Sequence, residues 1–267
     1  MKKISKILSV SLLFFGVIST QTKALTNEEN LTKIFSEIQI KHIKEYKMSF
    51  ENIKSSEDFA NTYHKALLLE KELSDPINRA YDKIKTDIPS EEEFKWIESF
   101  TPSMSIHLVA EATQLDLLID YIPFQKKAKM TPQKEDDMFI NLLIDVYGDG
   151  ETDYAKWFKQ TWDYGGCSHL GKGIHTKNLK DINSIFDKSK FFKKDLQEIN
   201  DSIFRDLTKN NLFCEPKNNV IKEINQILKT IPLTKEQKNK INARLKEFNK
   251  NKKEIEFNCN VKNCAYG

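Results

Sequence analysis

The chain has 267 residues and carries 42 lysines and arginines against 39 aspartates and glutamates. A chain of this length can bury a core without help from a metal or from cross-links. The near balance of positive and negative charge excludes the concentrated basic surface on which general nucleic-acid binding depends.

The N-terminus has the layout of a secretory signal peptide. Residues 1–6 are cationic, residues 7–18 form an uncharged and mostly apolar run, and residues 22–24 include small side chains before a cleavage point. The apolar run covers 12 residues, whereas a bilayer span needs about 20. We therefore predict a signal peptide over residues 1–24 and an exported mature chain, periplasmic or secreted, with no membrane span.

Removal of the leader changes the charge balance. Residues 1–24 contain four lysines and no acidic residue, so the mature chain keeps 38 of the 42 basic residues against 39 acidic ones. The resulting net charge of about −1 follows from those counts. No nucleic-acid partner is expected for such a surface.

Helix-start signals recur along the rest of the chain. A hydroxyl residue followed three positions later by an acid or amide forms a capping box, and a threonine before proline also favours a helix start. Starts of these two kinds lie at Thr26, Ser90, Thr101, Thr131 and Thr234. Apolar residues at spacings of three and four follow them, as in Ile199, Ile203, Phe204 and Leu207, which favours helices facing one core.

These signals predict an all-α fold. The expected helices cover residues 27–52, 56–73, 76–86, 91–99, 102–121, 132–147, 151–163, 177–187, 190–210, 217–230 and 235–256. Short connections between them favour antiparallel neighbours. We expect an irregular multi-helix bundle or helical-hairpin array, forming a single domain over residues 25–267 with a disulfide-tied C-terminal tail. The alternating residues 255–262 read as an extended tail with no obvious strand partner.

One pair on the predicted helix 102–121 could ligate a metal. His107 and Glu111 lie four residues apart, which places both on one helix face. One helix supplies only two ligands, and the H-E-x-x-H pattern is absent. We therefore predict no metal site and interpret the pair as ordinary polar residues.

The region from Gly148 to Gly173 breaks the helical pattern. It holds six of the eight glycines of the chain together with several aromatic residues. Glycines favour turns and close approaches, and tryptophan and tyrosine favour recognition surfaces. The segment is predicted to be either a disulfide-tied connection with core-filling tryptophans or an exposed recognition loop. Its candidate binding residues are Tyr154, Trp157, Trp162, Tyr164, His169 and Lys172.

The same segment also suggests a thiol nucleophile, an anion site and a calcium loop. Cys167 with His169 or His175 could form a thiol nucleophile and its base, although no family signature surrounds the cysteine. The backbone amides around Leu170-Gly171-Lys172-Gly173 could hold an anion, but the spacing differs from a phosphate-binding loop. The acidic residues at 145, 149, 151 and 153 resemble a calcium loop that lacks several required oxygen ligands.

The four cysteines are predicted to form two disulfides, because the chain is expected to be exported. We favour Cys167–Cys214 together with Cys259–Cys264, the second pair closing a short local loop. The alternative pairs Cys214 with Cys259 and Cys167 with Cys264. A zinc site using Cys259 and Cys264 is the third interpretation.

These features favour three functions, in the following order. The leading hypothesis is an exported bacterial binding protein without cofactors, for instance an inhibitor or immunity-type protein acting on a protein or cell-envelope partner. An envelope hydrolase using Cys167 and His169, or a metal at His107 and Glu111, is the main alternative. A structural role in an envelope assembly is the third. The sequence does not indicate an oligomeric state.

Overall fold

The computed structural model describes residues 29–83, 93–109, 114–149, 154–160, 166–250 and 254–259. The predicted signal peptide and the predicted helix start at Ser90 lie outside these residues. The described parts are predominantly helical but include two small antiparallel hairpins, so the all-α prediction is only approximately correct.

Helices and strands alternate along the chain as follows. After a short helical stretch at residues 29–34 come α2 (Glu37–Glu51), α3 (Ser56–Tyr81), the 3₁₀ helix η2 (Lys95–Ser99), β1 (Met104–Val109), β2 (Gln114–Ile119), α4 (Tyr121–Ala128), α5 (Lys134–Tyr147), β3 (Phe158–Gln160), β4 (Gly166–Ser168), α6 (Ile174–Phe186), α7 (Lys193–Lys209), α8 (Lys217–Thr230) and α9 (Lys235–Asn249).

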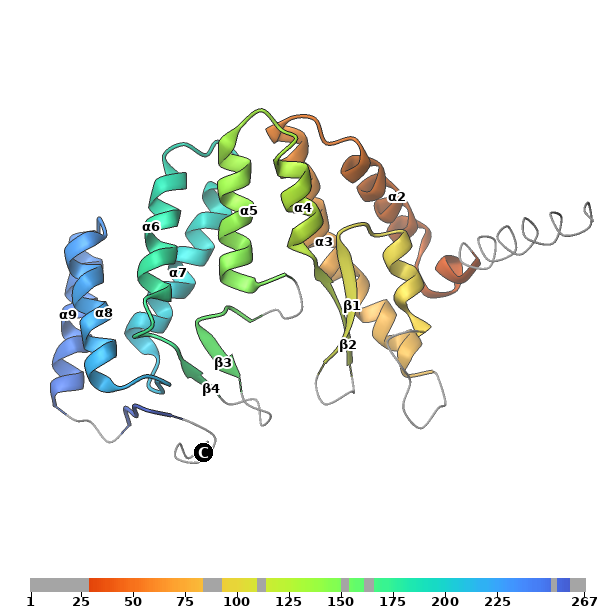
Figure 1. The fold of residues 1–267 in the computed structure, drawn as a ribbon. Coiled ribbons are helices and arrows are strands. Elements are labelled where there is room, and N and C mark those ends of the chain that lie inside the picture. Colours follow the sequence, from red (N-terminus) through yellow and green to blue (C-terminus); the bar gives the residue numbers. More distant parts are fainter. Residues whose placement is uncertain are drawn as a thin grey trace, which may run out of the picture.

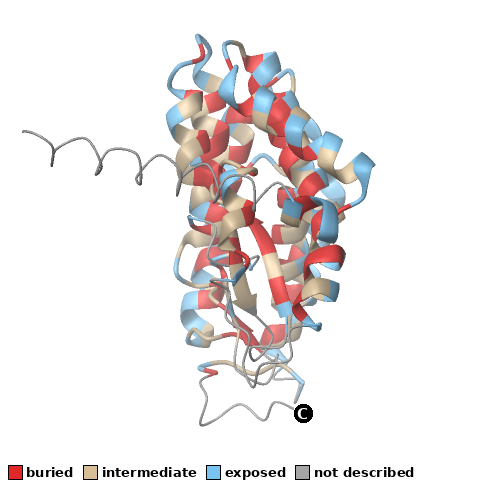
Figure 2. Ribbon diagram, turned by 90° about the vertical axis from the view of Figure 1, so that its right-hand side faces the viewer, coloured by how far each residue is buried: buried red, intermediate tan, exposed pale blue. Residues whose placement is uncertain are grey.

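The helices stand in a curved row that runs from α2 to α8 and α9, and both hairpins lie along its lower edge (Figure 1). A continuous apolar core extends through the row, from Leu31 to Phe248. Buried residues gather on the faces that the elements turn toward one another, while exposed residues mark the outer turns (Figure 2).

The N-terminal helical region is interrupted rather than continuous over 27–52. Ser36 starts α2 with a capping box: its hydroxyl accepts from the Gln39 amide, and the Gln39 side chain accepts from the Ser36 amide. Ile38 in the first turn of α2 is 66% exposed, whereas Leu31 before the interruption is buried.

The long helix α3 joins two helices that were predicted separately. Pro76 lies inside it and has no N–H to donate to the carbonyl of Glu72, four residues earlier. The Gln39 side chain donates to that carbonyl at 3.1 Å instead. A tertiary contact from α2 thus compensates for the proline, and the helix continues to Tyr81.

The largest error of the sequence prediction concerns residues 102–121. Instead of a helix they contain β1 and β2, paired antiparallel from Met104↔Ile119 to Val109↔Gln114. Alternate residues of the hairpin, such as Ile106 and Leu117, are buried, as period-two patterning requires. A following helix, α4, was also missed; the Asp120 side chain caps it by accepting from the Ile122 amide at 2.8 Å.

Two other predicted helices differ from the structure. Within residues 151–163, the described residues 158–160 form β3. Within residues 91–99, the described residues form η2, a 3₁₀ helix.

The C-terminal helices agree best with prediction. α8 covers the predicted residues 217–230, and Thr234 starts α9 with the expected capping box. α9 ends at Asn249 rather than at residue 256. The described tail is extended and has a partner after all, because Glu256 forms a parallel bridge with Leu212.

Candidate functional site

The glycine-rich segment contains the second hairpin, formed by β3 and β4. Gly166 at the start of β4 has to be glycine, because an added Cβ would lie 2.4 Å from the Lys159 carbonyl oxygen and 2.4 Å from the Phe158 ring. Trp157 precedes β3 and is buried, so it fills the core. Trp162 and Tyr164, two predicted binding residues, lie outside the described residues.

A disulfide joins β4 to the segment after α7. Cys167 and Cys214 are bonded, with a Cα–Cα distance of 5.2 Å and a sequence separation of 47. This pairing was predicted, and it removes the alternative that joined Cys167 to Cys264. Within the described residues it is the one disulfide shown, where two were expected. The second expected bond involves Cys264, which lies outside those residues, while Cys259 is buried.

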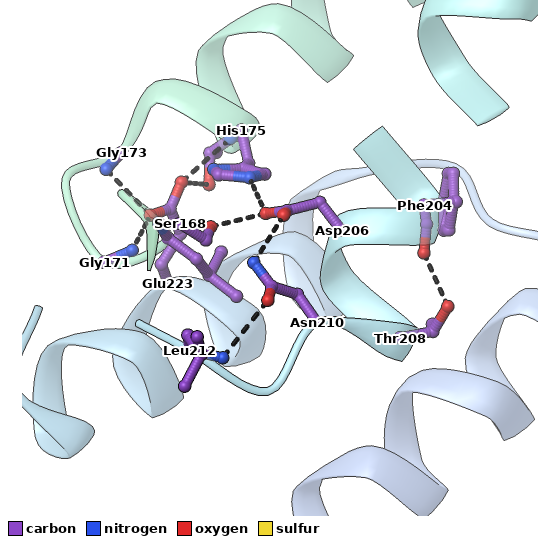
Figure 3. A network of polar contacts seen from close by, with 12 residues as sticks. Ser168, Gly171, Gly173, His175, Phe204, Asp206, Thr208, Asn210, Leu212 and Glu223 are labelled. Atoms are coloured by element: carbon purple, nitrogen blue, oxygen red, sulfur yellow. Dashed lines mark hydrogen bonds and ion pairs between the residues drawn. The ribbon is translucent and has the colours of Figure 1, made fainter. Parts of the chain in front are cut away.

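Asp206 of α7 holds three separate segments together (Figure 3). Its Oδ2 accepts from the Ser168 hydroxyl and from Nε2 of His175, the latter at 2.7 Å. Its Oδ1 accepts from the side-chain amide of Asn210 at 2.9 Å. The side-chain oxygen of Asn210 in turn accepts from the backbone amide of Leu212. One carboxylate therefore links β4, α6 and the segment that carries Cys214.

Glu223 of α8 occupies the amides at the start of α6 (Figure 3). Its Oε2 accepts from the backbone of Gly171 at 2.5 Å and of Gly173 at 2.8 Å. Its Oε1 accepts from the backbone and hydroxyl of Thr176. The backbone amides of the Leu170–Gly173 loop do bind an anionic group, as the sequence suggested. That group is the carboxylate of Glu223 and not an external ligand.

His169 and Lys172 share one carboxylate. Nδ1 of His169 lies 3.3 Å and Nζ of Lys172 lies 3.5 Å from Oε1 of Glu215. Burial lowers the pKa of His169, Lys172 lowers it further, and the hydrogen bond to Glu215 opposes the shift. Because both predicted binding residues already pair with Glu215, they connect the loop to the segment behind the disulfide.

The candidate catalytic residues do not form a nucleophile and its base. Cys167 is bonded to Cys214, and His175 is fully buried against Asp206. Ser168, His175 and Asp206 resemble the composition of a serine triad, but both donors meet the carboxylate, and the histidine does not lie between the other two. The arrangement orients a structural carboxylate and does not activate a hydroxyl.

The residues proposed as metal ligands do not form a metal site in the described part of the chain. His107 lies on β1, not on a helix, and its Nε2 is 2.8 Å from the Ser105 hydroxyl. Glu111, the other residue of the predicted pair, lies outside the described residues. Asp145 pairs with Lys177. Within the residues that the structure describes, no three His, Cys, Asp or Glu side chains gather closely enough to hold a metal ion.

A surface groove runs between the approach to β3 and α7, and we name it the α7 groove. Its cavity volume is about 520 Å³, and its lining residues are Tyr147, Tyr154, Ala155, Trp157, Phe158, Ser202, Arg205, Asp206, Lys209 and Asn210. Arg205 and Lys209 are exposed, and no described carboxylate forms an ion pair with either. Tyr154 is 42% exposed. The groove therefore combines aromatic walls with two available cations.

Sequence reasoning missed the two structural carboxylates, although a signal for both was present. Glu223 lies three residues after Val220, and Asp206 lies directly before Leu207, so each acid interrupts or borders an apolar stripe. An acidic residue on a core-facing stripe indicates a buried partner, because an unpaired charge would be costly there. Which partner it meets depends on contacts remote in sequence.

No known protein family, curated protein or solved structure matches this chain.

Proposed function

We propose that this protein is an exported binding protein that holds a protein or cell-envelope partner in the α7 groove. The observation that carries the proposal is the residue content of that groove: the exposed Tyr154 and Arg205, which has no ion pair with a described residue, meet on one concave surface. Tyrosine and arginine are two of the residue types that dominate binding energy at protein interfaces. The inhibitor or immunity-type role suggested by the sequence is one form of this function.

The scaffold behind the groove supports the proposal. Asp206 and Asn210 line the groove and also belong to the buried network that reaches the disulfide. A surface held in one conformation loses little conformational entropy when a partner binds, which favours affinity. A disulfide of this kind is also compatible with an oxidising compartment outside the cytoplasm.

The charge of the groove indicates the chemistry of the partner. Arg205 and Lys209 lie one turn apart on the exposed side of α7. Their charges are not balanced by an ion pair with a described residue, so a partner segment that carries carboxylates would complete them. None of the described helices is long and apolar enough to cross a membrane.

A charge-reversal experiment tests the proposed function. The double variant Arg205→Glu/Lys209→Glu should bind the envelope partner at least about tenfold more weakly than the parent protein. The matched control Lys222→Glu/Lys229→Glu reverses two exposed lysines of α8, one of them also in the last turn of its helix.

The readout is retention of envelope proteins on each immobilised variant, quantified by mass spectrometry, followed by titration of the purified partner. Loss of the partner from the α7 variant alone supports the groove. Equal retention by the two double variants contradicts it.

A further inference from the structure

A second cavity lies away from the disulfide, where α3, β2, α4, α5 and α7 meet. Its volume is about 210 Å³, below the roughly 300 Å³ at which pockets for drug-sized ligands begin. Its walls contain three tyrosines, three acidic residues and an apolar surface. The residues are Tyr63, Tyr121, Tyr147, Glu70, Asp195, Glu198, Leu67, Leu118, Ile119, Leu143 and Ile199. We name it the tyrosine pocket.

Two tyrosines of the pocket have almost fully buried side chains and hydroxyls without a described partner. Tyr63 is 4% and Tyr121 is 9% exposed, and no described residue donates to or accepts from either hydroxyl. The ring of Tyr63 packs edge-on against Phe139 in the core. Both hydroxyl oxygens keep some accessible surface in the cavity that they line, so each can donate to or accept from a bound polar group.

Tyr63 lines the pocket beside two acidic residues. Burial raises the pKa of Tyr63 well above its ordinary value, and Tyr121, Asp195, Tyr147 and Glu70 raise it further. All four of these neighbours line the same cavity. Of the four, Asp195 and Glu70 carry negative charge, and carboxylates in a cavity wall favour a cationic guest.

The cavity carries more negative than positive charge. Asp195 lies 3.1 Å from Nε2 of His64, whose side chain is 42% exposed. Among the described residues, Glu198 forms an ion pair with the exposed Lys194, at 3.7 Å, and such a surface pair contributes little. The carboxylates are too far apart to form a metal site within the described residues. A larger organic cation can contact several of them at once.

We propose that the tyrosine pocket binds a primary alkylammonium group, such as a lysine side chain or a free alkylamine. The three N–H donors of an ammonium match the carboxylates and the unpaired tyrosine hydroxyls. The stacked rings of Tyr121 and Tyr147, with centroids 6.2 Å apart, add a face that attracts cations. Leu143 and Ile199 provide an apolar wall for the methylene stem. This site shares Tyr147 with the α7 groove but does not depend on the function proposed there.

Calorimetry on the full-length mature protein tests the site. The probes are Nα-acetyl-lysine methylamide, its Nε-acetylated neutral form and 1,4-diaminobutane. We expect the lysine derivative or the diamine to bind, and the neutral form to bind at least about tenfold more weakly. Stronger binding of the lysine derivative indicates a side chain of a partner as the natural ligand, and stronger binding of the diamine indicates a free amine. Equal affinity for the neutral and charged lysine derivatives, or no binding of any amine, overturns the proposal.

Three variants locate the bound ammonium. Asp195→Asn and Glu198→Gln should each weaken binding severalfold, and Tyr63→Phe should do so through loss of one hydroxyl. Glu198 is exposed and Tyr63→Phe keeps the ring, so these two changes preserve the fold. The control Glu57→Gln lies on α3 outside the pocket and should leave affinity unchanged. Parent-like affinity in all three pocket variants overturns the assignment of this cavity.

Discussion

Two single side chains, the carboxylates of Asp206 and Glu223, hold the glycine-rich segment in one conformation. Glu223 is 3% exposed and receives three backbone amides around the start of α6. A charged acceptor for several amides is more stabilising than a neutral one, and its loss leaves buried donors without partners. This residue therefore contributes more to stability than its helix propensity indicates.

The variant Glu223→Gln should lower the free energy of unfolding by about 2–3 kcal/mol. The amide keeps the size of the side chain but places an NH₂ group where an acceptor is required. Urea unfolding of parent and variant measures the difference, and the exposed Glu57→Gln serves as the chemical control. A Glu223→Gln protein as stable as its parent would show that the carboxylate is dispensable.

His169 should make stability depend on pH. Its pKa is lowered from the ordinary value of 6.5, first by burial. Below that value the unfolded chain binds a proton that the folded chain does not, so stability is complete above about pH 6.5 and falls as the pH drops toward the lowered folded pKa. Unfolding curves across this range should show a smaller slope for His169→Gln. An identical slope in parent and variant would rule out this ring as the cause.

In the glycine-rich segment, the sequence predicted the disulfide but not the carboxylate that binds the loop amides. Cys167 and Cys214 were paired correctly, because the short spacing of Cys259 and Cys264 favoured a local loop and left the other two cysteines to pair. The occupant of the loop amides was not predictable, since Glu223 lies some 50 positions further along the chain. Contacts of that kind depend on tertiary packing, and local patterns do not encode them.

At the scale of single elements, the disulfide stabilises β4 and the segment after α7. It closes a loop with a sequence separation of 47, which the chain-entropy account values at about 4 kcal/mol. Replacing both Cys167 and Cys214 by serine should lower stability by up to that amount. Urea unfolding of the double variant under non-reducing conditions checks this, and an unchanged midpoint would contradict it.

Helix ends and helix interiors differed in how well the sequence predicted them. Caps with local partners, such as Thr234 with Gln237, were predicted correctly because both partners are close in sequence. The hairpin of β1 and β2 was mistaken for a helix because Thr101-Pro102 resembles a helix start. In α3, Pro76 suggested a break that Gln39 of another helix prevents. Tertiary contacts override local propensity in both cases.

At the scale of the whole molecule, the curved row of helices presents two different polar cavities. The α7 groove has aromatic walls and the cations Arg205 and Lys209, whereas the tyrosine pocket carries carboxylates. Tyr147 lines both cavities. We propose that the two surfaces bind groups of opposite charge. Changes at Arg205 and Lys209 test the α7 groove, and changes at Asp195 and Glu198 test the tyrosine pocket, because none of these four residues lines both cavities.

Photo-crosslinking from the α7 groove tests the proposed binding function most directly. A benzoylphenylalanine placed at Tyr154 should give a discrete crosslinked product in the native envelope, and the Arg205→Glu/Lys209→Glu change should abolish it. The same group at Met130, which is 69% exposed and outside the groove, should give no such product. Absence of a product at Tyr154, or the same products from both positions, would contradict a partner-binding groove on α7.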